Sequence, residues 1–451
     1  MSAHNDERRE TGADDQEHGR PEKPKRSRRW ALIVVALSVA MLAWSCVPTG
    51  YLTSTPISKL STGEAVIAIR MGEARSQSGL SAPIHDNWIM LLDAQGKHTA
   101  ALLEEENVGE LLWTERGISY GSEQWDYLTT EHGTRRDKLS GWNSSEVQRY
   151  ELSDGRIIVV FYEMDLAYQV DTIELDGSVT SVSTPGTRGD VGQCGDRILS
   201  IVDTEQLSRM KSEAFEAYAA QSGNDGNDGE QPEELSVVIQ LNDRDGDTPR
   251  LLGVAPMIDG LVSGQREFAC EGDVITIPSV QTGDPRATRV MAEGREEGTM
   301  VLERWDLSTG QRTIVPVIDE QENPIEVNRD RSIFHYRGVQ VGDEYRFISE
   351  GGDAFTVDLT SGRGRYLFSH TMEDSSRVLF QVTETGVYAL EDRWDDHHVT
   401  LSFTPWESGE RRVVWTNSKL SGYLERPSFL DSHVREIEAF SIRPGWDGGA
   451  Q

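Results

Sequence analysis

Two kinds of short turn alternate along most of this 451-residue chain. Turns of the first kind are polar, and each opens an apolar run of β-favouring residues; they lie at 114–118, 153–157, 194–198, 270–274, 330–333 and 383–387. Turns of the second kind end in glycine, at Gly96, Gly133, Gly177, Gly246, Gly310, Gly362 and Gly409. Two alternating turns predict a repeated hairpin unit, and repeats of this period are typical of solenoids and propellers.

The spacing of the second turn predicts the number of repeats. Successive glycines are 37 to 69 residues apart, and the shorter steps match a four-stranded blade of about 40–50 residues. The longest step contains an insertion at 204–234, with a predicted helix over 204–220 followed by an acidic loop. Seven glycines therefore predict an all-β fold of seven four-stranded blades over 64–445, with a flexible C-terminus at 446–451.

The first repeat starts without a partner for its inner strands. The run at 433–442, near the end of the chain, is a spare β-favouring segment. Pairing of this run with the first repeat would close the ring and hide edges that are otherwise exposed.

The turns WDLSTG, ending at Gly310, and VDLTSG, ending at Gly362, carry a family resemblance. They resemble the β-propeller superfamily, in the style of WD-like, YVTN-like or TolB-like repeats. The resemblance covers about residues 64–445 and implies a β-propeller.

The N-terminal region predicts a membrane tether. Residues 1–29 are charged and nearly free of apolar side chains, so we expect a disordered cytoplasmic tail. Residues 30–47 carry no charge and would form a transmembrane helix about 27 Å long. Basic residues directly before it place the N-terminus in the cytoplasm. The chain thus resembles a membrane-anchored bacterial extracytoplasmic protein, a single-pass protein of the cell membrane with a stalk at 48–63.

The same segment has a second interpretation. An apolar stretch after basic residues is also typical of a signal peptide, and Ala43-Trp44-Ser45-Cys46 resembles a lipobox, which would make Cys46 the lipidated residue of a lipoprotein. Either interpretation gives a tethered extracytoplasmic domain.

The net charge of −32 limits the partners. Affinity for nucleic acid comes from basic contacts with phosphates, so we expect no nucleic-acid partner. The expected partners are the membrane, through the N-terminal helix, and a protein or glycan.

Motifs for catalysis or metal binding are weak. The sequence has no G-x-S-x-G, HExxH, P-loop or paired CxxC motif. Asp243, Asp245 and Asp247 resemble a fragment of a calcium loop, but they lie in one of the repeat turns, where Asp is common for backbone reasons. We therefore predict no catalytic residue, no cofactor and no metal site, with these aspartates as weak candidates.

Cys194 and Cys270 sit at the same point of consecutive repeats. Two cysteines in an oxidising compartment favour a disulfide, with two isolated thiols as the alternative. In a ring, equivalent positions approach most closely near the axis, so a disulfide would lie at the inner ends of two blades.

These observations favour a binding, sensing or envelope-assembly module for a protein, peptide or glycan. The alternative is a propeller enzyme, of glycosidase, lyase or dehydrogenase type, with its site at the central channel. A single sequence does not reveal residues that converge on a channel from several blades, so enzyme activity stays open, with binding preferred.

Overall fold

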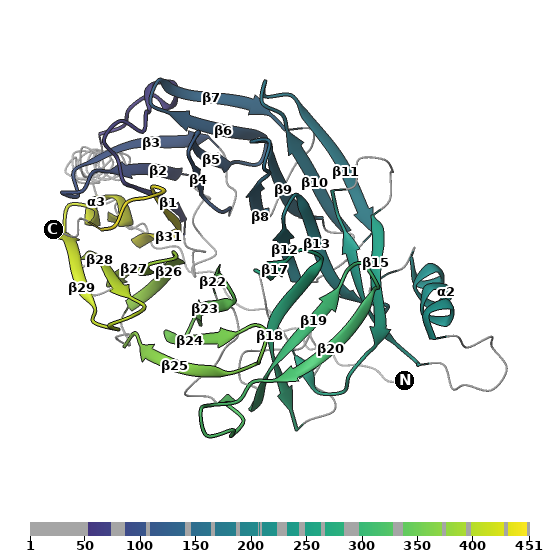
Figure 1. Cartoon of the computed structure of the whole chain (residues 1–451). Helices are drawn as coiled ribbons and strands as arrows, with labels where there is room; N and C mark the ends of the chain where they lie inside the picture. Colours follow the sequence, from purple (N-terminus) through teal and green to yellow (C-terminus); the bar gives the residue numbers. More distant parts are fainter. Residues whose placement is uncertain are drawn as a thin grey trace, which may run out of the picture.

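The computed structural model describes residues 53–73, 86–104, 109–139, 146–163, 167–185, 190–205, 207, 210–222, 232–242, 249–262, 267–283, 297–327, 337–371, 376–393, 398–427 and 432–448. Within these residues the strands form seven antiparallel sheets, which stand as blades around a central axis (Figure 1). The predicted all-β, seven-bladed propeller is therefore confirmed.

Strands in each blade are ordered from the axis outward. The first blade contains β31 (Ser432–Ile442), β1 (Ile67–Glu73), β2 (Asp86–Leu92) and β3 (His98–Glu104), with β30 (Glu425–Pro427) beside β31. The second contains β4 (Leu112–Thr114), β5 (Gly117–Gly121), β6 (Trp125–Thr130) and β7 (Gly133–Lys138). The third contains β8 (Glu146–Glu151), β9 (Ile157–Glu163), β10 (Ala167–Ile173) and β11 (Val179–Pro185). The fourth contains β12 (Asp190–Cys194), β13 (Arg197–Asp203), β14 (Leu235–Gln240) and β15 (Arg250–Pro256).

The other three blades follow the same order. In the fifth, β16 (Leu261–Val262) and β17 (Ala269–Glu271) both pair with β18 (Val274–Thr282), followed by β19 (Gly298–Asp306) and β20 (Gln311–Pro316), with β21 (Glu326–Val327) beside β19. The sixth contains β22 (Arg337–Val341), β23 (Glu344–Ile348), β24 (Asp353–Asp358) and β25 (Gly364–Ser369). The seventh contains β26 (Ser376–Val382), β27 (Gly386–Arg393), β28 (Val399–Pro405) and β29 (Arg412–Asn417).

The two predicted turns join different strand pairs. Five turns of the first kind connect the innermost strand of a blade to the second strand, from the β4–β5 turn to the β26–β27 turn. The prediction for the sixth blade is wrong in position: 330–333 lies outside the described residues, and the equivalent turn is at Gly342 and Asp343. The polar residues before β22 resemble a turn in sequence. The true turn, which lies between two apolar runs, resembles one equally, so the sequence alone does not distinguish the two positions.

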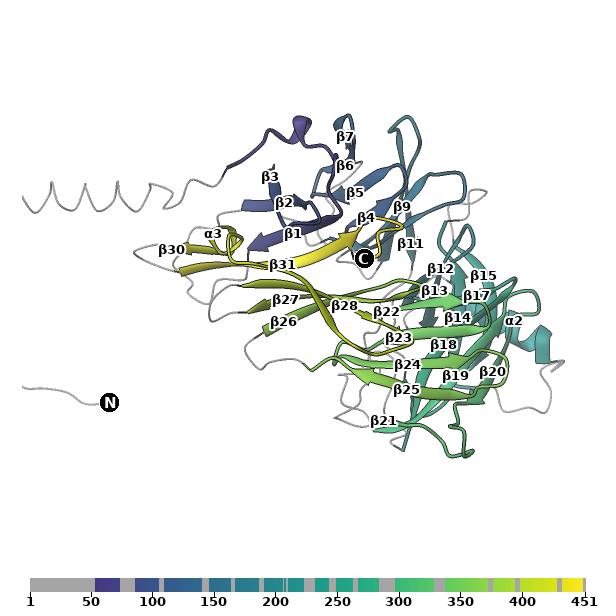
Figure 2. The same cartoon turned by 60° about the vertical axis from the view of Figure 1, so that its left-hand side comes forward.

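The ring closes through the C-terminal strand, as predicted. β31 pairs antiparallel with β1, with Ile442 opposite Ile67 and Phe440 opposite Ile69 (Figure 2). Apolar side chains of both strands join one buried cluster with residues of the seventh blade, including Leu401 and Tyr388. The two ends of the propeller therefore share one blade and one core.

The prediction of a stalk at 48–63 is partly wrong. Residues 53–62, which we name the N-terminal strap, pack on the propeller and contain the 3-10 helix η1 (Ile57–Lys59). Leu60 is fully buried in the core of the first and second blades. Its carbonyl accepts a hydrogen bond from the Thr134 hydroxyl at 2.8 Å, and the Thr55 amide donates to the Ala100 carbonyl at 2.8 Å. A single leucine among threonines and serines is a weak indication of burial, so the sequence favours a polar spacer at this segment.

Two further boundaries differ from the prediction. The helix of the insertion is α2 (Lys211–Ser222), which begins seven residues later than expected because Thr204 leaves β13 as part of a turn that seats Leu207 and Met210 in the core. The C-terminal residues 446–448 are packed rather than flexible, since the Trp446 ring stacks on Tyr388 at 5.6 Å. A second short helix, α3 (Ser421–Leu424), precedes β30.

Turns of the second kind join the third and fourth strands and dock each blade on its neighbour. Their described glycines have positive φ, and most approach the outermost strand of the preceding blade: Gly96 approaches β29, Gly177 β7, Gly310 β15, Gly362 β20 and Gly409 β25. Gly133 differs from the other glycines, because it approaches Ser58 of the N-terminal strap instead of an outer strand. A methyl group at Gly362 would lie 2.7 Å from the Pro316 carbonyl oxygen. The repeated glycine is thus required for both conformation and proximity.

We predict that Gly362→Ala destabilises the propeller more than Gly342→Ala. Both glycines have positive φ, +71° and +62°, but a methyl group at Gly342 would meet nothing within 4 Å. The backbone strain of about 1–2 kcal/mol is common to both variants, whereas contact with the fifth blade should add about 1–3 kcal/mol at Gly362. Chemical denaturation of both variants measures the difference. Equal losses would show that the turn does not dock the blades.

Candidate functional site

The innermost strands bring charged residues from six blades to one end of the channel. Because every blade runs up and down in the same order, its innermost strand starts at the same face of the ring. Charged residues stand at or near these starts: Glu110, Glu146, Glu267, Arg337, Arg377, Glu436 and Glu438. Arg337 and Glu110 are 227 residues apart in sequence, and a guanidinium nitrogen of Arg337 donates to the Glu110 carboxylate at 2.8 Å.

These residues surround a cavity of about 450 Å³, which we name the channel site. Its lining comes from the first, second, third, sixth and seventh blades: Gly109, Glu110, Glu146, Arg337, Ile348, Glu350, Arg377, Val378, Leu379, Phe380, Glu438, Ala439 and Phe440. A smaller cavity of about 190 Å³ shares Glu110, Arg337, Phe380 and Phe440 with it. The main volume falls within the range of about 300–1,000 Å³ that is common for ligand sites.

Arg149 of β8 organises the third-blade side of the channel site. Its guanidinium donates to both carboxylate oxygens of Glu146, at 2.7 and 2.6 Å. The same group donates to Asp126 of β6 at 3.1 Å and to the Ser119 hydroxyl at 2.5 Å. Arg149 and Asp126 are both about 2% exposed. A bidentate pair with further partners fixes the Glu146 carboxylate in one orientation at the cavity wall.

A second buried ion pair supports the first-blade side. Arg70 of β1 is fully buried, lies 3.2 Å from the Glu438 carboxylate and donates to the Gly121 carbonyl at 2.9 Å. Gly72 leaves the room for Glu438, because a methyl group at Gly72 would overlap its carboxylate. A methyl group at Gly109 would lie 2.9 Å from the Arg70 guanidinium. Glycine at both positions therefore lets charged side chains lie against the backbone.

Burial and ion pairing act on the protonation of these groups. Burial raises the pKa of the Asp126 carboxyl to about 7, although Arg149 opposes the shift. Burial also raises the pKa of Glu438, against the attraction of Arg70. Glu110 raises the pKa of Arg337, which stays charged at every physiological pH. Arg337 therefore stays charged in the channel site, while Asp126, which lies behind the site, titrates near neutrality.

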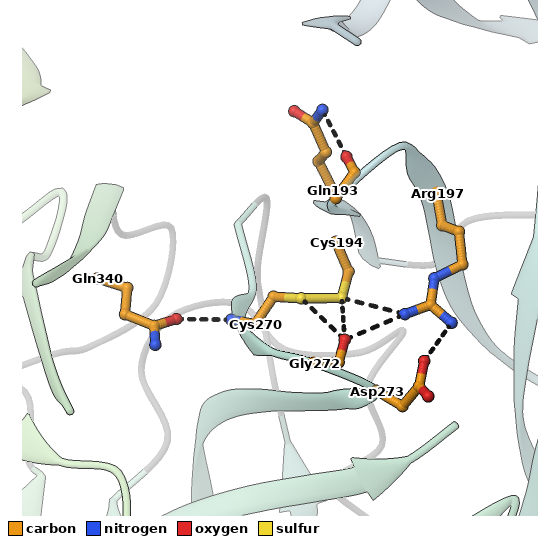
Figure 3. Close-up of a disulfide and its surroundings, with 8 residues drawn as sticks. Gln193, Cys194, Arg197, Cys270, Gly272, Asp273 and Gln340 are labelled. Atoms are coloured by element: carbon orange, nitrogen blue, oxygen red, sulfur yellow. Dashed lines mark hydrogen bonds and ion pairs between the residues drawn. A yellow bond between two sulfur atoms is a disulfide. The ribbon is translucent and has the colours of Figure 1, made fainter. Parts of the chain in front are cut away.

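Among the residues predicted from sequence, Cys194 and Cys270 lie in the described part of the chain. They form a disulfide with Cα atoms 5.3 Å apart, between β12 and β17 of neighbouring blades (Figure 3). Gln340 of β22 accepts a hydrogen bond from the Cys270 amide at 2.8 Å, and the Arg197 guanidinium donates to the Gly272 carbonyl at 3.2 Å. The disulfide therefore joins the fourth and fifth blades near the axis. Cys194 ends its strand, so this link lies away from the channel site.

The remaining predicted positions fall elsewhere in the chain. Asp243, Asp245 and Asp247 lie outside the described residues, as does Cys46. Within the part of the chain that the structure describes, no group of three or more His, Cys, Asp or Glu side chains is arranged to hold a metal ion. The helices in that part are all too short or too polar to cross a membrane, and the predicted span at 30–47 lies outside it.

Sequence reasoning missed the channel site. Its charged lining residues are spread from Glu110 to Glu438, and none of them stands in a recognisable sequence motif. A usable signal existed, since a charged residue recurs at the start of successive innermost strands. It becomes visible only when the repeats are aligned on the strands rather than on the turns.

The chain matches no protein-family model and no curated protein. Among solved structures it is similar to a protein from Lactobacillus plantarum at 11% identity and a TM-score of 0.44, over 84% of this chain and 99% of that one. It is also similar to the β-propeller domain of the Trilobed protease from Pyrococcus furiosus, at 10% identity and a TM-score of 0.44, over 80% of this chain and 98% of that one. The assignment of the fold depends on the strand topology of this chain, and that of the function depends on the channel site.

We predict that Asp126→Asn removes a pH dependence of stability. The ordinary pKa of Asp is 3.8, and that of folded Asp126 is about 7. Between these values the folded protein holds one more proton than the unfolded chain, so rising pH lowers the free energy of unfolding by about 1.4 kcal/mol per pH unit. Asparagine keeps the acceptor for Arg149 and does not titrate. The stability of Asp126→Asn relative to the natural chain should therefore increase from pH 4 to pH 7 in thermal melts, and a constant difference would contradict this.

Proposed function

We propose that this protein is a membrane-tethered extracytoplasmic module whose propeller binds a protein, peptide or glycan at the channel site. The observation that carries the proposal is the cavity of about 450 Å³, lined from five blades by fixed charged groups and aromatic rings. Cavities that combine apolar walls with a few oriented polar groups are the usual form of a ligand site.

The state of the carboxylates supports binding rather than catalysis. Glu146, Glu110 and Glu438 each contact an arginine, as does Glu436, which pairs with Arg377. Asp126, whose pKa would suit general acid–base chemistry, is buried under Arg149 and away from the cavity lining. These groups are held as oriented charges, which suits recognition. The propeller enzyme remains the alternative.

The proposed location has two supports. The apolar segment at 30–47 follows a basic cluster, which predicts an anchor with the C-terminal domain outside the cytoplasm. The disulfide between Cys194 and Cys270 fits an oxidising compartment, because such bonds are rare in the cytosol.

Filling the channel site should abolish ligand binding. We predict that the full-length chain, purified in detergent, binds members of a peptide array or a glycan array, and that Leu379→Trp loses this binding because the indole occupies the cavity. Leu102→Trp is the matched control, since Leu102 is 39% exposed on the outer strand of the first blade. An absence of binders, or binders that Leu379→Trp retains, would contradict the proposed site.

We predict an N-in, C-out topology. Alkaline phosphatase fused after Gln451 should be active, and a green fluorescent protein fused there by the same export route should stay dark. The Cys46→Ser chain should remain in the membrane fraction if 30–47 is a retained anchor, whereas release would identify a lipoprotein. Phosphatase that is inactive beside a fluorescent fusion would reject the proposed location.

A further inference from the structure

The channel site has an excess of negative charge. Its lining includes four carboxylates, from Glu110, Glu146, Glu350 and Glu438, and two guanidinium groups, from Arg337 and Arg377. The fully buried Arg70 and Arg149 behind the wall are each engaged with one of these carboxylates. The whole chain has the same sign of charge, at −32.

The lining arginines are poorly suited to an anionic ligand. Arg337 contacts two carboxylates, with Glu110 at 2.8 Å and Glu267 at 3.5 Å. Arg377 is paired with Glu436. An anion would have to displace an existing carboxylate from each guanidinium, and the displaced carboxylate would remain beside it.

Glu350, in contrast, is available to a ligand. It follows β23, is exposed, and lines the cavity. Among the described residues it takes part in no ion pair. Loss of its charge would therefore break no contact within that part of the chain.

Apolar side chains line the same cavity as the four carboxylates of the channel site. Val378 and Phe380 of β26 and Phe440 of β31 line the same cavity. Such a wall can cover the methylene stem of a lysine or arginine side chain while its cationic head reaches a carboxylate. A small neutral glycan would use the wall but not the charge.

We propose that the ligand of the channel site is a peptide segment that presents a basic side chain, with Glu350 as the group that receives its cation. The inference rests on the proposed binding function and names its ligand class. The charge complementarity with an acidic propeller also favours the approach of a cationic partner.

Three blocked glycine pentapeptides test the ligand class, with arginine, norleucine or glutamate as the central residue. Isothermal titration of the full-length chain should give the tightest binding for the arginine peptide, and its advantage over norleucine should shrink as salt rises. Glu350→Gln should weaken the arginine peptide by about threefold, as expected for loss of one exposed ion pair. The matched control Glu384→Gln, an exposed Glu in the β26–β27 turn at the opposite face, should leave binding unchanged.

The outcomes separate the two proposals. Equal binding of the arginine and norleucine peptides, tighter binding of the glutamate peptide, or an unchanged affinity in Glu350→Gln would overturn the basic-peptide inference and leave the site intact. Binding of the arginine peptide that survives Leu379→Trp would instead overturn the channel site itself, and the inference with it.

Discussion

The ring depends on a repeated contact between a glycine turn and the blade before it. Each described turn between a third and a fourth strand places its glycine against the preceding outer strand or, at Gly133, against Ser58 of the strap. The Gly310 and Gly362 carbonyls also accept hydrogen bonds from Val254 and Ile318, at 3.3 and 3.0 Å. Hydrophobic packing between blades is non-directional, so these polar, close contacts fix the angle at which one blade follows the next.

The angle between neighbouring blades determines which side chains meet at the axis. Buried ion pairs such as Arg149 with Glu146 and Arg70 with Glu438 are costly, because each ion loses several kcal/mol of hydration. The Arg149 guanidinium also donates to Ser119 and Asp126 of the second blade, so the second and third blades must hold one spacing for these contacts to form. The channel site is thus a property of the assembled ring rather than of any one blade.

The sequence predicted features that arise from local chemistry. Glycine turns and runs such as Arg197–Asp203, buried on both faces, are visible in any window of ten residues. Outer strands such as Gly133–Lys138 are polar and half-exposed, and they were missed. The charged channel was also missed, because partners such as Arg337 and Glu110 meet through the fold and not through spacing. Leu60 shows the same limit, since its burial depends on two blades that the strap itself joins.

Closure by β31 has a consequence for biosynthesis. Ile67 and Ile442 pair across the seam, so β1 completes its hydrogen bonds only after nearly the whole chain has been made. At about 5–20 residues per second, that interval is on the order of 20–75 s. Throughout it the inner edge of β1 is an open template for any other strand. A chain that is stalled or truncated before β31 leaves this edge of β1 permanently unpaired. C-terminal truncations are therefore expected to aggregate, and aggregation would select against them before a loss of ligand binding does.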